Sequence, residues 1–132
     1  MTPERDLRRL LRDLRPVRAP DAYVFASADD AAAAELAPFA TVREDEGATV
    51  VVTRARADQA GLRYDFVAAR ITLTVASALD AVGLTAAVAG RLARAGIACN
   101  VIAGLHHDHL FVPVARAEEA MALLGDLGDR GR

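Results

Sequence analysis

The clearest pattern along the chain lies in its second half. Apolar and polar residues alternate through residues 66–75, which predicts a half-buried strand. A helix is expected next, because apolar residues recur on one helical face at Leu84, Val88, Leu92 and Ala95. Gly96 stands where a left-handed residue commonly ends a helix. Strands over 97–103 and 109–114, a turn over 106–108 and a helix over 116–124 complete this half.

The predicted order β-α-β-β-α is a split βαβ unit that lacks only its last strand. Right-handed crossovers would place both helices on one face of an antiparallel sheet, so the fold class is α+β. The first half holds spare strands. We expect one of them, Tyr23–Ala26, to complete the sheet.

The first half is less regular. Leu7, Leu10, Leu11 and Leu14 mark one face of a helix over 4–15, which Pro16 and Pro20 end. Strands are predicted over 23–26, 39–43 and 48–53, and a short helix over 55–62. The alanine-rich run 29–37 fits a loop or a short helix. Residues 44–47, three acidic residues and a glycine, predict a turn between two strands. A cation site formed by the three carboxylates is the less simple interpretation.

Composition limits the classes of function. The 132 residues form one compact domain or two very small ones, and 53% hydrophobic content is enough for a core. No apolar run reaches the roughly 18 residues needed to cross a bilayer, and the arginine-rich start lacks a signal core, so a cytoplasmic protein without membrane contact is expected. A net charge of −2 and six aromatic residues do not favour nucleic acid as a partner.

The stretch with the most specific chemistry is the bend over 77–85. Glycine at position 83 permits a positive φ or a close backbone approach, and the amides that open the following helix suit a carboxylate. Asp80 could accept hydrogen bonds from an ammonium group. One loop could therefore satisfy both charges of a zwitterion. The same residues also fit ordinary helix capping and turn formation, and spacing alone leaves both readings open.

Several motifs resemble known regulatory proteins. Gly83-Leu84-Thr85 before an alanine-rich helix, and the run 95–102 (AGIACNVI), resemble the ACT domain signature. Residues 77–83, 100–104 and 107–113 are similar to a bacterial family of small tandem-ACT proteins related to aspartokinase ACT regions and eukaryotic cytosolic arginine sensors. Weaker matches reach back to residues 47–52 and 23–25, so the resemblance covers most of the chain.

The resemblance implies a ferredoxin-like βαββαβ fold in two ACT-like halves, over 1–65 and 66–127, with antiparallel sheets and helices on one face. The glycine- and charge-rich composition of the C-terminus predicts a disordered tail over 128–132. It implies a non-catalytic amino-acid sensor that forms a homodimer and acts on an unnamed protein target. The implied ligand contacts are Asp80, Val82, Gly83, Leu84, Thr85 and, from the neighbouring unit, Asn100. Two departures are Ala78, where a second serine is expected, and Leu105-His106, where aromatic residues are usual.

Three alternatives stay open. Residues 106–109 (HHDH) could bind a metal, but a strand places only two ligands on each face. An enzyme could use Cys99, but this single cysteine falls in a predicted buried strand, and no catalytic motif appears. The third alternative is a ligand-free dimerisation module. We expect no catalytic residue, no cofactor and no metal.

Overall fold

The computed structural model describes residues 2–130 and divides the chain into two compact units. Unit 1 comprises Met1–Ala19 and Ala69–Arg132, and unit 2 comprises Pro20–Ala68. Strand β1 (Pro16–Ala28) begins in unit 1 and ends in unit 2, and strand β4 (Val67–Leu73) returns the chain to unit 1. No helix among residues 2–130 is long and apolar enough to span a membrane.

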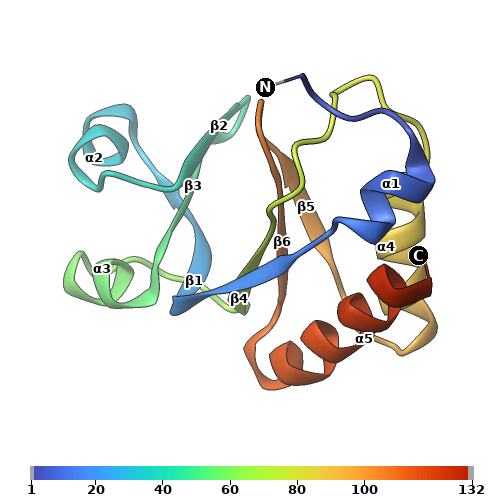
Figure 1. The fold of residues 1–132 in the computed structure, drawn as a ribbon. Coiled ribbons are helices and arrows are strands. Elements are labelled where there is room, and N and C mark those ends of the chain that lie inside the picture. Colours follow the sequence, from blue (N-terminus) through green and yellow to red (C-terminus); the bar gives the residue numbers. More distant parts are fainter. Residues whose placement is uncertain (1, 131–132) are drawn as a thin grey trace. The chain divides into compact units, whose positions relative to one another are not determined.

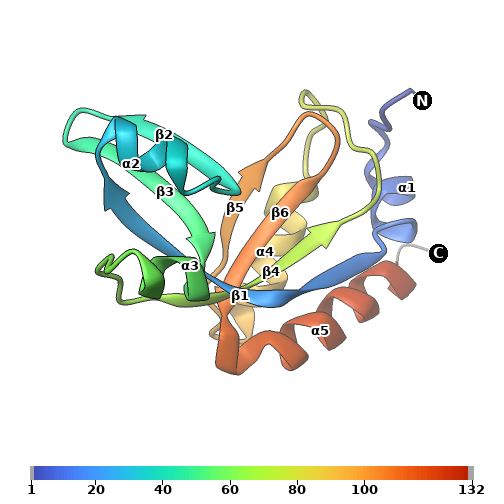
Figure 2. The same ribbon diagram turned by 90° about the vertical axis from the view of Figure 1, so that its left-hand side faces the viewer.

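Unit 1 combines a sheet with helices packed against it (Figure 1). Its strands are the first residues of β1, then β4, β6 (Asp108–Pro113) and β5 (Asn100–Ala103), hydrogen-bonded in the order β1-β4-β6-β5. Its helices are α1 (Leu7–Arg12), α4 (Leu84–Arg94) and α5 (Ala117–Arg130), the last preceded by a short 3₁₀ turn at Val114–Arg116. Strands β5 and β6 form an antiparallel hairpin that pairs Asn100 with Phe111 and Ala103 with Asp108 (Figure 2).

The core of unit 1 follows the predicted periodicity. Alternate residues of β4 and β6 face the helices, and each helix contributes residues three or four apart. The fully buried members include Leu10, Leu14, Ile71, Leu73, Leu84, Val88, Leu92, Leu110, Val112, Ala120 and Leu124. The predicted inner faces of the strand over 66–75 and of the helices over 84–95 and 116–124 are therefore confirmed.

Unit 2 is smaller and carries two single-turn helices. Its strands have the order β2-β3-β1, where β2 is Ala40–Glu44 and β3 is Gly47–Thr53. Helices α2 (Asp30–Glu35) and α3 (Arg54–Gln59) cover one face of this sheet (Figure 2). Its core is formed by Val24, Ala26, Ala28, Ala33, Leu36, Ala48, Val50, Val52 and Ala57. The acidic turn predicted over 44–47 is confirmed, since Glu44 pairs with Gly47 across the β2–β3 hairpin.

The α+β prediction, with antiparallel strands and helices, is confirmed. The C-terminal sheet is completed by β1, which contains the expected Tyr23–Ala26 but begins earlier, at Pro16. Pro16–Ala19, the start of β1, belongs to unit 1, whereas Tyr23–Ala26 pairs with Val50–Thr53 in unit 2. The sequence hides the early start of β1, because Pro16 and Pro20 are typical of residues that end a helix. Proline is tolerated where its missing N–H is not needed by a neighbouring strand.

Two predicted helices also have different lengths. Helix α1 begins at Leu7, capped by the Asp6 carboxylate, and does not extend over all of residues 4–15. Helix α5 continues to Arg130, so residues 128–130, expected in a disordered tail, are helical. The tail's last two positions, 131 and 132, lie outside the described residues.

The core of unit 1 predicts that two leucine substitutions differ in their effect on stability. Leu92→Ala removes a fully buried side chain from α4 and should lower the free energy of unfolding by about 2–5 kcal/mol. Leu105→Ala, at a position 71% exposed, should change it by no more than about 0.5 kcal/mol. Urea denaturation measures both. Equal effects of the two substitutions would contradict the assigned core.

Candidate functional site

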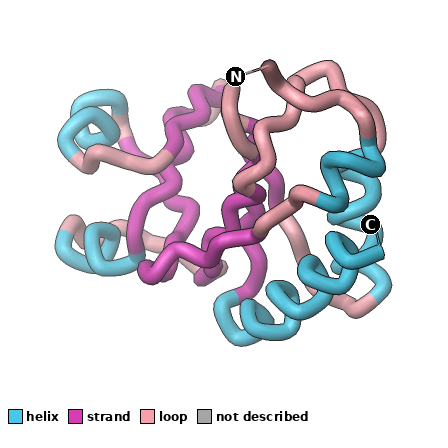
Figure 3. Tube along the Cα trace, viewed as in Figure 1, coloured by secondary structure: helices cyan, strands magenta, loops and turns pink. Residues whose placement is uncertain are grey.

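The predicted ligand loop is the connection between β4 and α4, which Figure 3 shows as a long irregular segment. It runs from Thr74 to Gly83 within unit 1. The Thr74 and Val75 N–H groups donate to the carbonyls of Arg15 and Leu14, and Ser77 forms an isolated parallel bridge with Glu4. The loop therefore has an ordered path, and the start of the chain lies along it.

Gly83 is the N-cap of α4 and has φ +106° and ψ −17°. This left-handed conformation suits glycine, and no side chain caps the helix. The first N–H groups of a helix have no partner within the helix, and they lie at its positive end. The start of α4 can therefore accept an anionic group from outside the helix.

Asp80 is the acidic group of the loop. Its carboxylate accepts a hydrogen bond from Arg5 Nε at 3.0 Å, and the two side chains are 73% and 60% exposed. Gly83 also has a neighbour, because a Cβ built on it would lie 3.0 Å from Leu7 Cδ2. Side chains of residues 5 and 7 thus contact the two positions to which the sequence assigned the ligand's charges.

The six predicted contact residues do not share one environment. Asp80, Val82, Thr85 and Asn100 are exposed, Gly83 is half-buried, and Leu84 packs in the core. Asn100 begins β5, whereas Ala103 at the other end of β5 lies beside the loop. At about 3.3 Å per residue, Asn100 is about 10 Å along the strand from that end. A contact from Asn100 to a ligand on this loop would therefore have to come from a second copy.

A small cavity of about 80 Å³ lies under the loop. Its lining consists of Ser77, Ala78, Leu79, Ala81, Leu84, Thr85, Ala103 and Asp108. Of the six predicted residues, Leu84 and Thr85 belong to it. Sites that enclose a drug-sized ligand measure about 300–1,000 Å³. The cavity is thus too small to enclose a free amino acid as it stands.

The histidine motif is used for local contacts within unit 1. His109 Nδ1 lies 2.9 Å from Thr72 Oγ1, and Ser77 Oγ donates to Asp108 Oδ2 at 3.1 Å. Burial, with the nearby Arg70 charge, lowers the pKa of His109. Among residues 2–130, no group of three or more His, Cys, Asp or Glu side chains is placed to hold a metal ion.

Cys99 lies just before β5 and packs against the core of unit 1. Burial raises the pKa of the Cys99 thiol to about 11. The thiolate is the nucleophilic form of cysteine. At neutral pH this side chain is therefore a protonated, half-buried thiol.

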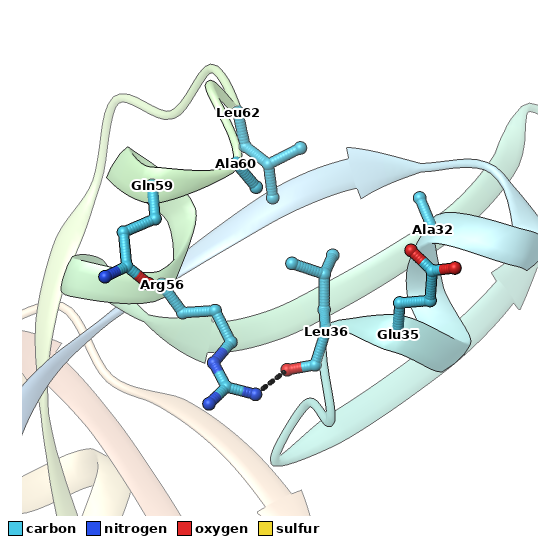
Figure 4. Close-up of a pocket in the computed structure, with 7 residues that line it drawn as sticks. All are labelled: Ala32, Glu35, Leu36, Arg56, Gln59, Ala60 and Leu62. Carbon is cyan, nitrogen blue, oxygen red and sulfur yellow. Dashed lines mark hydrogen bonds between the residues drawn. The ribbon is translucent and has the colours of Figure 1, made fainter.

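Larger hollows are found in unit 2. One, of about 500 Å³, lies between α2 and α3 and is lined by Ala32, Glu35, Leu36, Arg56, Gln59, Ala60 and Leu62 (Figure 4). Arg56 reaches across it and donates from Nη1 to the Leu36 carbonyl at 2.8 Å. This contact closes the C-terminal end of α2, so helix capping accounts for the arginine. The groove is open and its charged residues are exposed.

Sequence reasoning missed Arg5 and Leu7 as neighbours of the loop. Their spacing indicated a helix face, and they stand more than seventy residues before Asp80 and Gly83. No local signal joins such distant segments. The arginine-rich N-terminal segment was only a weak indication of this contact, since any of its arginines could form an ion pair with a carboxylate of a distant segment.

The backbone of the loop gives a second stability prediction. Gly83→Ala forces a side chain into the left-handed region and against Leu7, so the free energy of unfolding should fall by about 1–2 kcal/mol. Gly125→Ala, inside α5 with open space around it, should be neutral or stabilising by about 0.5–1 kcal/mol. Thermal denaturation checks the pair. A Gly83→Ala protein as stable as Gly125→Ala would disprove the assigned turn.

Cys99 gives a prediction about reactivity. A pKa of about 11 in place of 9.0 leaves roughly 100-fold less thiolate at pH 7.5. Alkylation by iodoacetamide should therefore be about 100-fold slower in the native protein than in the denatured chain, and it should accelerate as the pH rises toward 11. Rapid stoichiometric labelling at pH 7 would contradict the assigned environment.

Comparison with known proteins gives matches over both halves of the chain. Models of the ACT domain match residues 2–69 and 68–126. None of the curated proteins searched matches the chain.

Solved structures support the same relationship. A protein of unknown function from Vibrio cholerae, described as a possible transport protein, is 44% identical with a TM-score of 0.84, over 92% of this chain and 95% of that one. The regulatory subunit of aspartate kinase from Thermus flavus is 13% identical with a TM-score of 0.65, over 85% of this chain and 95% of that one, and so shares the fold. The chain therefore belongs to the ACT domain family and carries two ACT domains in tandem.

Proposed function

We propose that this protein is an amino-acid sensor that binds its ligand at the β4–α4 loop of unit 1 and regulates a separate protein. ACT domains point to a regulatory, ligand-binding role, and this is the starting point. The observation that carries the finer proposal is the uncapped start of α4 at Gly83, with an exposed carboxylate three residues earlier.

The proposed chemistry assigns each charge of a zwitterion to a different group. The ligand's carboxylate would accept hydrogen bonds from the backbone N–H groups at the start of α4, between Gly83 and Thr85. Its ammonium group would donate to the Asp80 carboxylate. Val82 and Leu84 would flank the ligand. These roles use binding groups only, so the proposed function involves no reaction and no cofactor.

A homodimer would complete the site. The cavity of about 80 Å³ is too small for an amino acid in one chain, and a second copy could close a larger space over the loop. Three large apolar side chains are exposed near it, with Leu79 at 67%, Val82 at 84% and Leu105 at 71%. Leu79 and Val82 stand on the β4–α4 loop and Leu105 on the β5–β6 turn, and the Ser77–Asp108 hydrogen bond joins that loop to the start of β6. Asn100 of the second copy would supply an amide contact.

Regulation would follow from unequal affinity. A ligand shifts an equilibrium only if it binds one conformation or assembly better than another. A site shared by two copies gives this difference, because the complete site exists only in the dimer. The protein target would then recognise one of the two states.

A ligand-free dimerisation module is the second candidate. The three exposed apolar side chains favour it, because such surfaces commonly mark protein–protein contacts. Ligand binding separates the two candidates, since an interaction module gains no stability from any free amino acid.

The proposal predicts ligand-dependent stability. Among the twenty standard L-amino acids, at least one should stabilise the protein by about 2.7 kcal/mol at 100 times its Kd, which corresponds to a rise in Tm of roughly 5–10 °C. Differential scanning fluorimetry measures this directly. No shift with any of the twenty would leave the dimerisation module as the better account.

A matched pair of variants locates the site. Asp80→Asn removes the acceptor proposed for the ammonium group and should weaken binding about 10- to 100-fold. Asp45→Asn makes the same change on the exposed β2–β3 turn and should leave Kd unchanged. Isothermal titration calorimetry gives both values. If Asp80→Asn binds as tightly as Asp45→Asn, the ligand lies elsewhere.

A further inference from the structure

Residues 4–7, here called the strap, run along the proposed ligand loop within unit 1. The Glu4 N–H donates to the Ala76 carbonyl at 2.8 Å, and the Ala78 N–H donates to the Glu4 carbonyl at 2.9 Å. This is a short parallel strand pairing. The strap therefore uses backbone groups of the loop that would otherwise be open to a ligand or a partner.

The next strap residue supplies a cation to Asp80. Arg5 Nε lies 3.0 Å from Asp80 Oδ1. The Arg5 guanidinium therefore pairs with the same carboxylate that is proposed to bind the ligand's ammonium group. Both side chains are more than half exposed. Exposed ion pairs of this kind are weak and are easily exchanged for another cation.

The last strap residue covers the start of the ligand helix. Leu7 Cδ2 stands 3.0 Å from the position a Gly83 Cβ would take, and the Cγ stands at 3.8 Å. The side chain therefore lies against the backbone at the point where α4 begins. A ligand bound at this point would have to share the space beside Gly83 with the Leu7 side chain.

The strap has its own local order but little burial. The Glu4 carboxylate accepts from the N–H groups of Asp6 and Arg5 at 3.1 and 3.0 Å, which lowers its pKa, and the Asp6 carboxylate caps α1. The helix is anchored in the core further on, at Leu10 and Leu14. Residues 5–7 are exposed. The strap can therefore leave the loop while the core of unit 1 stays packed.

We propose that the strap is a built-in competitor that occupies the amino-acid site and must be displaced by the ligand. This inference rests on the proposed function of the loop and adds how the site is regulated. Arg5 takes the place of the ligand's ammonium, and Leu7 lies against Gly83 at the start of the helix whose amides would bind the ligand's carboxylate. A partner that binds residues 4–7 and removes them from the β4–α4 loop would therefore raise the protein's affinity for the amino acid.

Calorimetric titration of three full-length proteins tests the competition. The probe is whichever standard L-amino acid most raises the Tm of the unsubstituted chain, of Arg5→Gln or of Arg8→Gln in the twenty-member panel. Arg5→Gln removes the competing cation and should tighten Kd about two- to fivefold. Arg8→Gln removes an exposed charge from the first turn of α1, three residues further on, and should leave Kd unchanged.

Amide hydrogen exchange measures displacement of the strap directly, and the loss of the Arg5 charge alone would not change it. Saturating amino acid should speed exchange of the Ala78 N–H, which is bonded to Glu4, and leave the Ala87 N–H inside α4 unchanged. Unchanged or weaker binding by Arg5→Gln, or slower exchange at Ala78, would overturn the strap while the sensor proposal stands. Absence of binding by all three proteins would overturn both.

Discussion

The proposed site depends on the backbone conformation at Gly83, where the chain begins α4. Gly83 adopts a left-handed conformation at the N-cap and offers no side chain to the first turn of the helix. The backbone donors there need a partner from elsewhere in the sequence or from outside the molecule. Asp80, the small cavity and the strap lie around this helix end, which no side chain caps. A side chain at position 83 would be strained at this positive φ, so the N-cap residue itself supplies no cap.

Stability in unit 1 is unevenly distributed around that loop. The helices and the sheet bury long aliphatic side chains on both sides of the loop, from Ile71 and Leu73 before it to Leu84 and Val88 after it. The loop and the strap instead present exposed charges and apolar side chains, held by a few hydrogen bonds. Segments of this kind open locally at low cost, without global unfolding. A rigid frame with a weakly held contact is suited to a regulatory switch.

The fold was largely predictable from sequence because the alternation in β4 and the spacing in α4 and α5 match their buried faces. The path of β1 was not predictable from sequence. Pro16 and Pro20 look like helix ends, but they lie in a strand that begins in unit 1 and ends in unit 2. At the site, the sequence indicated Asp80 and Gly83 through turn and helix-start chemistry. It gave no sign of Arg5 and Leu7, because contacts between distant segments arise from tertiary packing and leave no local periodicity.

Amide NMR spectra during titration with the stabilising amino acid test the central claim most directly. The account predicts saturable shifts of the Leu84, Thr85 and Ala86 N–H signals, which open α4, with no change at the β2–β3 turn over residues 44–47. Shifts confined to unit 2, with the α4 signals unmoved at saturation, would contradict it.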